Sequence, residues 1–204
     1  MDQQSDPSTP GFSPEDQAYV EAEYATLEQL CAQRSGEPRD PEQVRRLVAA
    51  GQLPGPAYVL PDGREMFWPD YFAPVDAAGG VDGLHDHFVQ QHRAATNALG
   101  LPGVDPEEDW RGYLSGDYGV CLREVIPEAM VEKAALMSQI DALIALPAPA
   151  DDQWRRTLTG AVDELDEILR PFTDHDRQRW GGTSRDSHVA GVRARFLTDD
   201  ATTG

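Results

Sequence analysis

The chain has 204 residues, a length that forms one substantial hydrophobic core or, at most, a main domain with a small appendage. Its 17 basic and 36 acidic side chains give a formal net charge of -19, which repels phosphate backbones and anionic lipid head groups and argues against nucleic acid and membrane surfaces as partners. No apolar run reaches the roughly 20 residues that span a bilayer, and the N-terminus is acidic and polar, so we expect a cytoplasmic protein.

The first elements in chain order are a polar leader and two helices. Residues 1–12 are rich in Ser, Pro, Gln and Asp, and we expect them to be disordered. Ser13 has the features of a helix N-cap and is followed by a proline, two acids and apolar residues at helical spacing, which predicts a helix to about Arg34. Asp40 begins a shorter second helix, which ends at Gly51.

A small β-hairpin is predicted next. Residues 57–60 and 64–68 are rich in aromatic and β-branched side chains and flank an Asp-Gly turn. Two helices and a hairpin indicate a winged-helix-like subunit over residues 13–72. The acids of its second helix and wing outnumber their arginines, so we expect this subunit to pack or to dock a protein, and not to bind DNA.

The remainder of the chain is predicted to form a helical core over residues 80–198. Its helices share an apolar stripe at helical spacing and are expected at 81–99, from Pro127 to Pro147, from Asp151 or Asp152 onward, and from Ser184 to about residue 198. Residues 199–204 are expected to be a frayed tail. The predicted fold class is therefore mainly α: a helical single domain over residues 13–198, with an N-terminal winged-helix-like unit and one small β-hairpin.

The histidines and cysteines form no ligand set of recognised spacing. His85, His87 and His92 lie on the helix predicted at 81–99 without an i, i+4 pair. Cys31 and Cys121 form no metal-type or redox-type pair, and we expect two reduced thiols. A dinucleotide fingerprint, a P-loop and a zinc spacing are missing from the sequence, so we predict no metal site and no cofactor.

Two segments, 110–123 and 170–186, combine aromatic, glycine, arginine and carboxylate residues without a clear helical or strand period. Such composition indicates a shaped surface, and we expect the two segments to form one site. Alternation over 120–123 predicts a short strand with Cys121 and Arg123 on one face. We expect one cleft to contain the largest directional side chains of both segments, which are Trp110, Tyr113, Tyr118, Arg123, Arg177 and Arg185.

The candidate catalytic residues are those able to act as acid, base, orienting group or nucleophile: Tyr113, Asp117, Tyr118 and Cys121. A buried inert cysteine and packing tyrosines are the alternative. The candidate substrate-binding residues supply guanidinium forks, aromatic faces and a helix N-terminus: Trp110, Arg123, Arg177, Trp180, Ser184 and Arg185. Arginines that pair with nearby carboxylates, such as Asp117 and Asp174, are the structural alternative.

Three motifs carry a resemblance to a known family: the run Val44 to Phe72, the segment Tyr113-Leu-Ser-Gly-Asp-Tyr-Gly-Val-Cys-Leu-Arg123, and the segment Asp176-Arg-Gln-Arg-Trp-Gly-Gly-Thr-Ser-Arg-Asp186. From Tyr24 to Phe196 the chain resembles an uncharacterised family of small actinobacterial proteins, described only as natural product biosynthesis proteins. Trp180 stands where we expect another aromatic residue in that family. The resemblance implies a pathway context and no established reaction.

We therefore predict a small tailoring enzyme or a substrate-binding component of such a pathway, acting on a small polar, carboxylate-bearing intermediate. Because the sequence holds no known catalytic constellation, enzymatic activity is left open. In the alternative, the winged-helix-like unit docks a pathway protein or peptide without catalysis. A pocket shared by the two segments favours the first function, and segments that merely pack loops onto the core favour the second.

Overall fold

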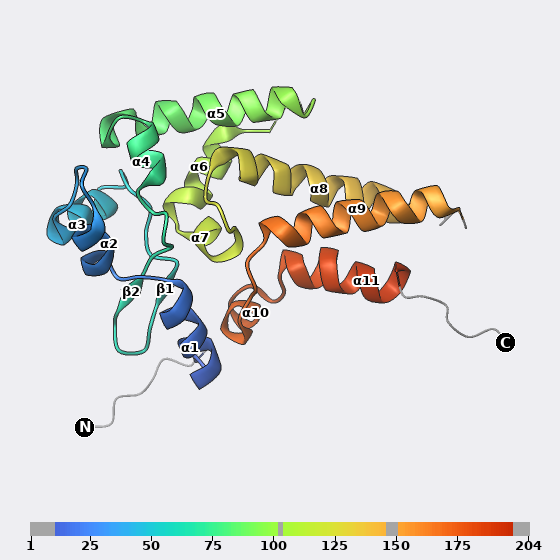
Figure 1. The fold of residues 1–204 in the computed structure, drawn as a ribbon, viewed down its shortest axis with the longest axis horizontal. Coiled ribbons are helices and arrows are strands. Elements are labelled where there is room, and N and C mark those ends of the chain that lie inside the picture. The colour runs from blue at the N-terminus through green and yellow to red at the C-terminus, as the bar shows by residue number, and fades with distance from the viewer. Residues whose placement is uncertain (1–10, 102–103, 146–150, 198–204) are drawn as a thin grey trace.

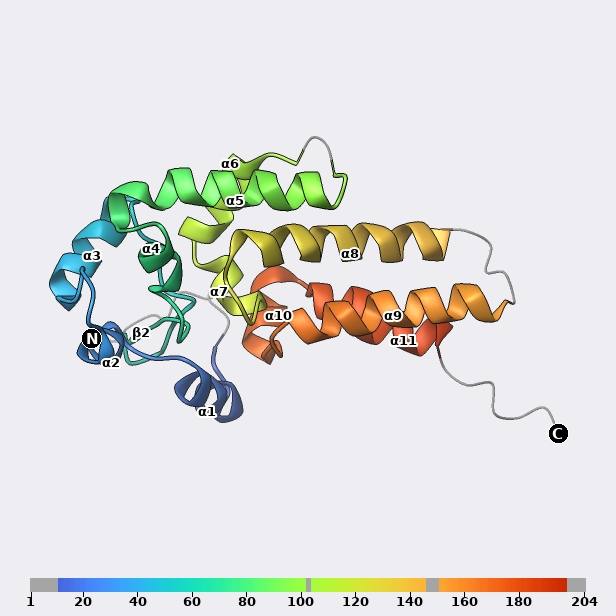
Figure 2. The same ribbon diagram turned by 45° about the horizontal axis from the view of Figure 1, so that its top comes forward.

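The computed structural model describes residues 11–101, 104–145 and 151–197. Within these ranges the protein is mainly helical, with one two-stranded antiparallel hairpin. Three long helices, α5 (Leu84–Ala98), α8 (Pro127–Ala145) and α9 (Asp152–Ile168), lie side by side in one half of the molecule (Figures 1 and 2). The N-terminal elements form the other half. The predicted disordered leader and frayed tail lie almost entirely outside the described residues.

The N-terminal segment forms two helices, α1 (Pro14–Glu23) and α2 (Leu27–Gln33), so the prediction of one continuous helix to Arg34 is wrong. Ala25 interrupts it by pairing with Phe67, with N–H···O distances of 2.9 and 2.8 Å in the two directions. Thr26 then begins a new helix with a capping box, because its side chain accepts from Gln29 N while the Gln29 side chain accepts from Thr26 N. A tertiary contact thus overrides helical spacing.

The shorter helix and the hairpin are confirmed. Helix α3 (Pro41–Ala49) begins after the N-cap Asp40. Strands β1 (Tyr58–Val59) and β2 (Glu65–Met66) pair Tyr58 with Met66 and Val59 with Glu65. The short helices α4 (Ala73–Ala77) and η1 (Val81–Gly83) then lead into α5.

The two segments expected to be irregular are largely helical. They contain α6 (Pro106–Leu114), α7 (Asp117–Cys121) and α10 (Asp174–Trp180). The last helical elements among the described residues are the π-helical turn η2 (Arg185–Ala190) and α11 (Gly191–Phe196). The predicted strand at 120–123 is wrong, because Val120 and Cys121 end α7. In this segment Leu122 alone is paired, in a single bridge with Leu169.

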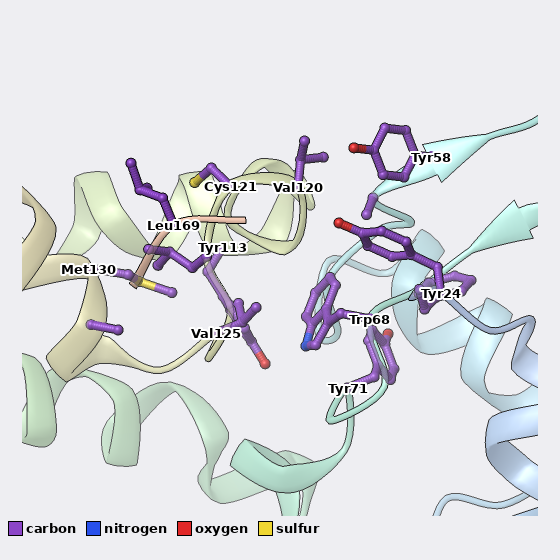
Figure 3. Close-up of a cluster of buried hydrophobic side chains, with 14 of the residues drawn as sticks. Tyr24, Tyr58, Trp68, Tyr71, Tyr113, Val120, Cys121, Val125, Met130 and Leu169 are labelled. Atoms are coloured by element: carbon purple, nitrogen blue, oxygen red, sulfur yellow. The ribbon is translucent and has the colours of Figure 1, made fainter. Parts of the chain in front are cut away.

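One hydrophobic core joins the two halves of the molecule. Figure 3 shows Trp68 and Tyr71 of the N-terminal half beside Tyr113 and Val125 of the helical half. Buried hydrogen bonds cross the same boundary. The Tyr24 hydroxyl donates to the carbonyl oxygen of Gly119 at 3.1 Å, and the hydroxyl of Tyr58 in β1 donates to the carboxylate of Asp176 in α10. Helices α7 and α10, which carry most of the candidate site, are therefore held where the halves meet (Figure 1).

Candidate functional site

A cavity of about 190 Å³ lies between α7, the first turns of α8, and the corner that connects α10 to η2. We call it the Lys133 pocket; its lining consists of Asp117, Cys121, Lys133, Phe172, Trp180, Gly182, Thr183 and Ser184. The two segments singled out in the sequence do converge here. The pocket brings together four of the ten predicted site residues, which are Asp117, Cys121, Trp180 and Ser184.

Lys133 is the residue of this pocket that the sequence analysis missed. It is the single lysine of the chain, since all the other basic side chains are arginines. Its Nζ donates to Cys121 Sγ at 3.4 Å and lies 5.8 Å from the centroid of the Tyr118 ring. Among the described residues, no carboxylate lies within ion-pair distance of this ammonium. The sequence signal that could have identified Lys133 is that the chain contains no other lysine.

The Cys121 thiol is buried, and its chemistry follows from that burial. Burial raises the pKa of the Cys121 thiol, and the Lys133 ammonium lowers it by less, so the thiol is mainly protonated at neutral pH. A sulfur in this state accepts the lysine hydrogen bond without forming an ion pair. Cys121 therefore orients the ammonium, and its predicted role as a nucleophile stays a prediction.

Asp117 and Trp180 form one wall of the pocket, and Arg179 connects them by contacting both side chains. The Arg179 guanidinium donates to Asp117 Oδ1 at 3.1 Å and lies 4.5 Å from the centroid of the Trp180 ring. Ser115 Oγ donates to Asp117 Oδ2 at 2.8 Å. Asp117 is therefore paired with Arg179, and it forms no ion pair with Lys133. Trp180 remains 38% exposed at the rim.

The α10–η2 corner, residues Gly181 to Asp186, forms a second wall, to which Gly182, Thr183 and Ser184 contribute. The Asp186 carboxylate connects this corner to α10. Arg177 Nε donates to both of its oxygens at 3.1 Å, and Thr183 Oγ1 donates to Oδ2 at 2.7 Å. Ser184 Oγ is buried at this wall and has no hydrogen-bond partner among the described residues. Arg177 thus shapes the wall from outside and does not line the pocket.

The aromatic candidates lie in the core between α5, α6 and α7. Trp110 and Tyr113 pack against Phe88, and burial raises the pKa of the Tyr113 hydroxyl. Tyr118 donates to Asp109, which also binds Nε2 of the fully buried His92 at 2.7 Å. Burial, reinforced by Asp109, raises the pKa of Tyr118. These tyrosines are protonated hydrogen-bond donors at neutral pH.

The two remaining arginines lie outside the pocket. Arg123 is exposed. Its backbone N–H donates a hydrogen bond to the carbonyl oxygen of Ile168, and its carbonyl oxygen accepts one from the Arg170 guanidinium. Arg185 pairs with Asp166 and donates to the Leu169 carbonyl oxygen at 3.3 Å. The six side chains expected in one cleft are therefore spread over the core, the outer side of the corner and the surface. Their predicted parts in catalysis or ligand binding stay predictions, while Arg177–Asp174 and Arg179–Asp117 are carboxylate pairs of the structural kind.

Two common functional features are absent from the described ranges. No group of three or more His, Cys, Asp or Glu side chains is placed to hold a metal ion. In the same part of the chain, no helix is both long and apolar enough to cross a bilayer.

Comparison with known sequences identifies the family of the chain. Residues 85–197, more than half of the chain, match the profile of a family of unknown function (DUF6058), and the chain belongs to this family. The match runs from α5 to α11 and includes every residue that lines the Lys133 pocket. No curated protein and no solved structure gives a significant match.

Proposed function

We propose that this member of the DUF6058 family binds a small carboxylate-bearing metabolite in the Lys133 pocket, as a substrate-binding component or small tailoring enzyme of a natural product pathway. The observation that carries the proposal is the single lysine of an acidic chain, placed in a cavity without a carboxylate partner among the described residues. An ammonium in such a position gains most from an external anion.

The rest of the pocket suits a small polar ligand. A cavity of about 190 Å³ is smaller than the roughly 300–1,000 Å³ of drug-sized sites, which limits the ligand to a compact metabolite. The unpartnered Ser184 hydroxyl supplies a donor in the lining of the pocket. Phe172 and the Trp180 ring supply apolar surface for the body of the ligand.

The side chains in and around the pocket bear on what happens beyond binding. The protonated Cys121 and the buried tyrosines favour binding and orientation over nucleophilic attack. The biosynthetic context rests on the motif resemblance described above. We therefore place ligand binding first and any tailoring reaction second.

Binding is tested by thermal unfolding and calorimetry against a panel of small carboxylates, amino acids and acyl acids. A true ligand at a hundred times its Kd adds about 2.7 kcal/mol to the free energy of unfolding. Lys133→Gln should abolish this stabilisation. Arg155→Gln, which removes an exposed positive charge from α9 away from the pocket, should keep it. Equal binding by Lys133→Gln and the unchanged protein would refute the proposal.

A second readout uses the uniqueness of Lys133. An amine-acylating reagent can modify this side chain and the α-amino group, and peptide mass spectrometry separates the two products. We expect the bound carboxylate to slow acylation of Lys133 and leave the α-amino group unaffected. Equal protection of both amines would indicate a general effect of the ligand on the reagent.

The alternative function is docking of a pathway protein by the winged-helix-like unit. Its arginines are engaged in ion pairs, Arg45 with Glu28 and Arg64 with Glu21, while Val59 of β1 remains 55% exposed. Arginines already paired with acids, on a unit whose acids outnumber its arginines, together with an exposed apolar tip favour a protein partner over nucleic acid. This alternative becomes the better proposal if no carboxylate stabilises the protein.

A further inference from the structure

A second cavity, of about 280 Å³, lies between α4, α5 and the first turn of α8. We call it the α4–α5 pocket. Its lining is mostly apolar and includes Pro74 and Ala77 of α4, Leu84 and Phe88 of α5, and Pro127 of α8. Helix α5 contacts both α4 and α8 (Figure 1). Except for Ile126, the residues that line the cavity belong to these three helices. A cavity of this lining suits a compact apolar group.

Three polar side chains lie in the lining of this apolar cavity: His87, Gln91 and Glu128. His87 and Gln91 are one helical turn apart and lie on the same face of α5. Within the described ranges, these three side chains have no hydrogen bond or ion pair, whereas the neighbouring Asp76 is paired with Arg34. The polar groups of the pocket are therefore available to a ligand.

We propose that the α4–α5 pocket binds a compact apolar molecule that carries a protonated amine. Glu128 accepts hydrogen bonds from the amine, and Gln91 and His87 offer further acceptors beside it. A carboxylate ligand is disfavoured here, because Glu128 is the charged side chain of the lining and the whole chain carries -19. Glu128 is exposed, so the apolar contacts supply most of the affinity and the ion pair supplies selectivity.

This site is separate from the Lys133 pocket, with which it shares no lining residue. It prefers the opposite charge. The inference can therefore be tested independently of the proposed function, by measuring the probes in a variant that lacks Lys133.

The experiment compares three probes of similar shape in the Lys133→Gln variant: 2-phenylethylamine, 2-phenylethanol and 3-phenylpropionate. Calorimetry should give the tightest binding for the amine, about twofold to fivefold tighter than the alcohol. The acid should bind most weakly. Glu128→Gln should bring the amine to the affinity of the alcohol. Glu132→Gln, an exposed charge loss one turn along α8, should change neither.

A second variant tests the cavity itself. Ala77 is exposed on α4, so Ala77→Trp can fill the pocket without entering the core. Binding of the amine and binding of the alcohol should both be lost in this variant. The proposal is overturned if none of the probes binds, if the acid binds as tightly as the amine, or if Glu128→Gln leaves the preference unchanged.

Discussion

Gly119 and Trp68 join the two halves of the molecule through a contact between backbone and ring. Trp68 is 1% exposed, and a Cβ atom added to Gly119 would lie 2.2 Å from its Cε3 atom. The Gly119 carbonyl oxygen also accepts the Tyr24 hydroxyl. The glycine of the Asp-Tyr-Gly-Val-Cys motif is thus required for packing, and a side chain there displaces the largest fully buried residue of the core.

Gly119→Ala should therefore destabilise the protein by about 1–3 kcal/mol, as overpacked core positions do. Gly160, in the middle of α9, is the matched control, because an added Cβ there meets nothing within 4 Å. Gly160→Ala should be neutral or stabilise the helix by up to about 1 kcal/mol. Urea unfolding of both variants measures the difference. Equal changes in the free energy of unfolding for the two variants would mean that Trp68 moves aside without destabilising the protein.

At the scale of single elements, local signals made much of the fold predictable. The caps at Ser13, Asp40 and Asp151 and the Asp-Gly turn act within a few residues, so the sequence revealed them. Helix α7 was missed because five residues are too few to show a helical period. The break at Ala25 was missed because its cause, the bridge to Phe67, lies far away in the sequence.

The candidate site was predictable only in part. Segment composition located two walls of the Lys133 pocket, since glycines and directional side chains mark a shaped surface. It did not distinguish Arg179, which pairs with Asp117 at the wall, from Arg185, which pairs with Asp166 outside the pocket. Lys133 lies on the core helix α8, and the third wall therefore became visible only when that helix was placed against α7.

The α10–η2 corner depends on Asp186, and this dependence should vary with pH. Burial raises the pKa of Asp186, but hydrogen bonds from Thr183 and Arg177 outweigh burial and leave the pKa below its usual value of 3.8. A depressed folded-state pKa stabilises the protein above the unfolded value, and the contribution is lost as pH falls through the folded value. Because the Asp186 side chain is 36% exposed, solvent screening keeps the effect small.

We expect Asp186→Asn to be less stable than the unchanged protein by about 1 kcal/mol at pH 7. The gap should narrow as pH falls below about 4. Denaturant unfolding of both proteins between pH 7 and pH 3 gives this curve. Asp163→Asn, which removes an exposed partner of Arg193, is the control and should show a smaller loss at pH 7. A gap that stays constant with pH would assign the loss to packing of the corner.

Across the whole molecule, the surplus of acids dominates the electrostatics. Exposed ion pairs such as Arg64–Glu21 and Arg193–Asp163 are local and contribute little each. They also leave a formal charge of -19, whose mutual repulsion acts over long distances and opposes the compact state. Salt screens both effects, so its net influence on stability shows which of the two is larger.

We predict that added salt stabilises this protein at neutral pH. Raising the ionic strength from about 10 to about 150 mM shortens the Debye length from about 30 to about 8 Å, which removes repulsion between distant acids more completely than attraction within contact pairs. A gain of about 1 kcal/mol raises the Tm of a chain of this size by about 2–4 °C. The same measurement at the isoelectric point, near pH 4.4, is the control, because the net charge there is close to zero and the stabilising effect of salt should vanish. A Tm that falls with salt at pH 7 would show instead that the ion pairs at the surface outweigh the long-range repulsion, and the acidic surplus would then be a matter of solubility alone.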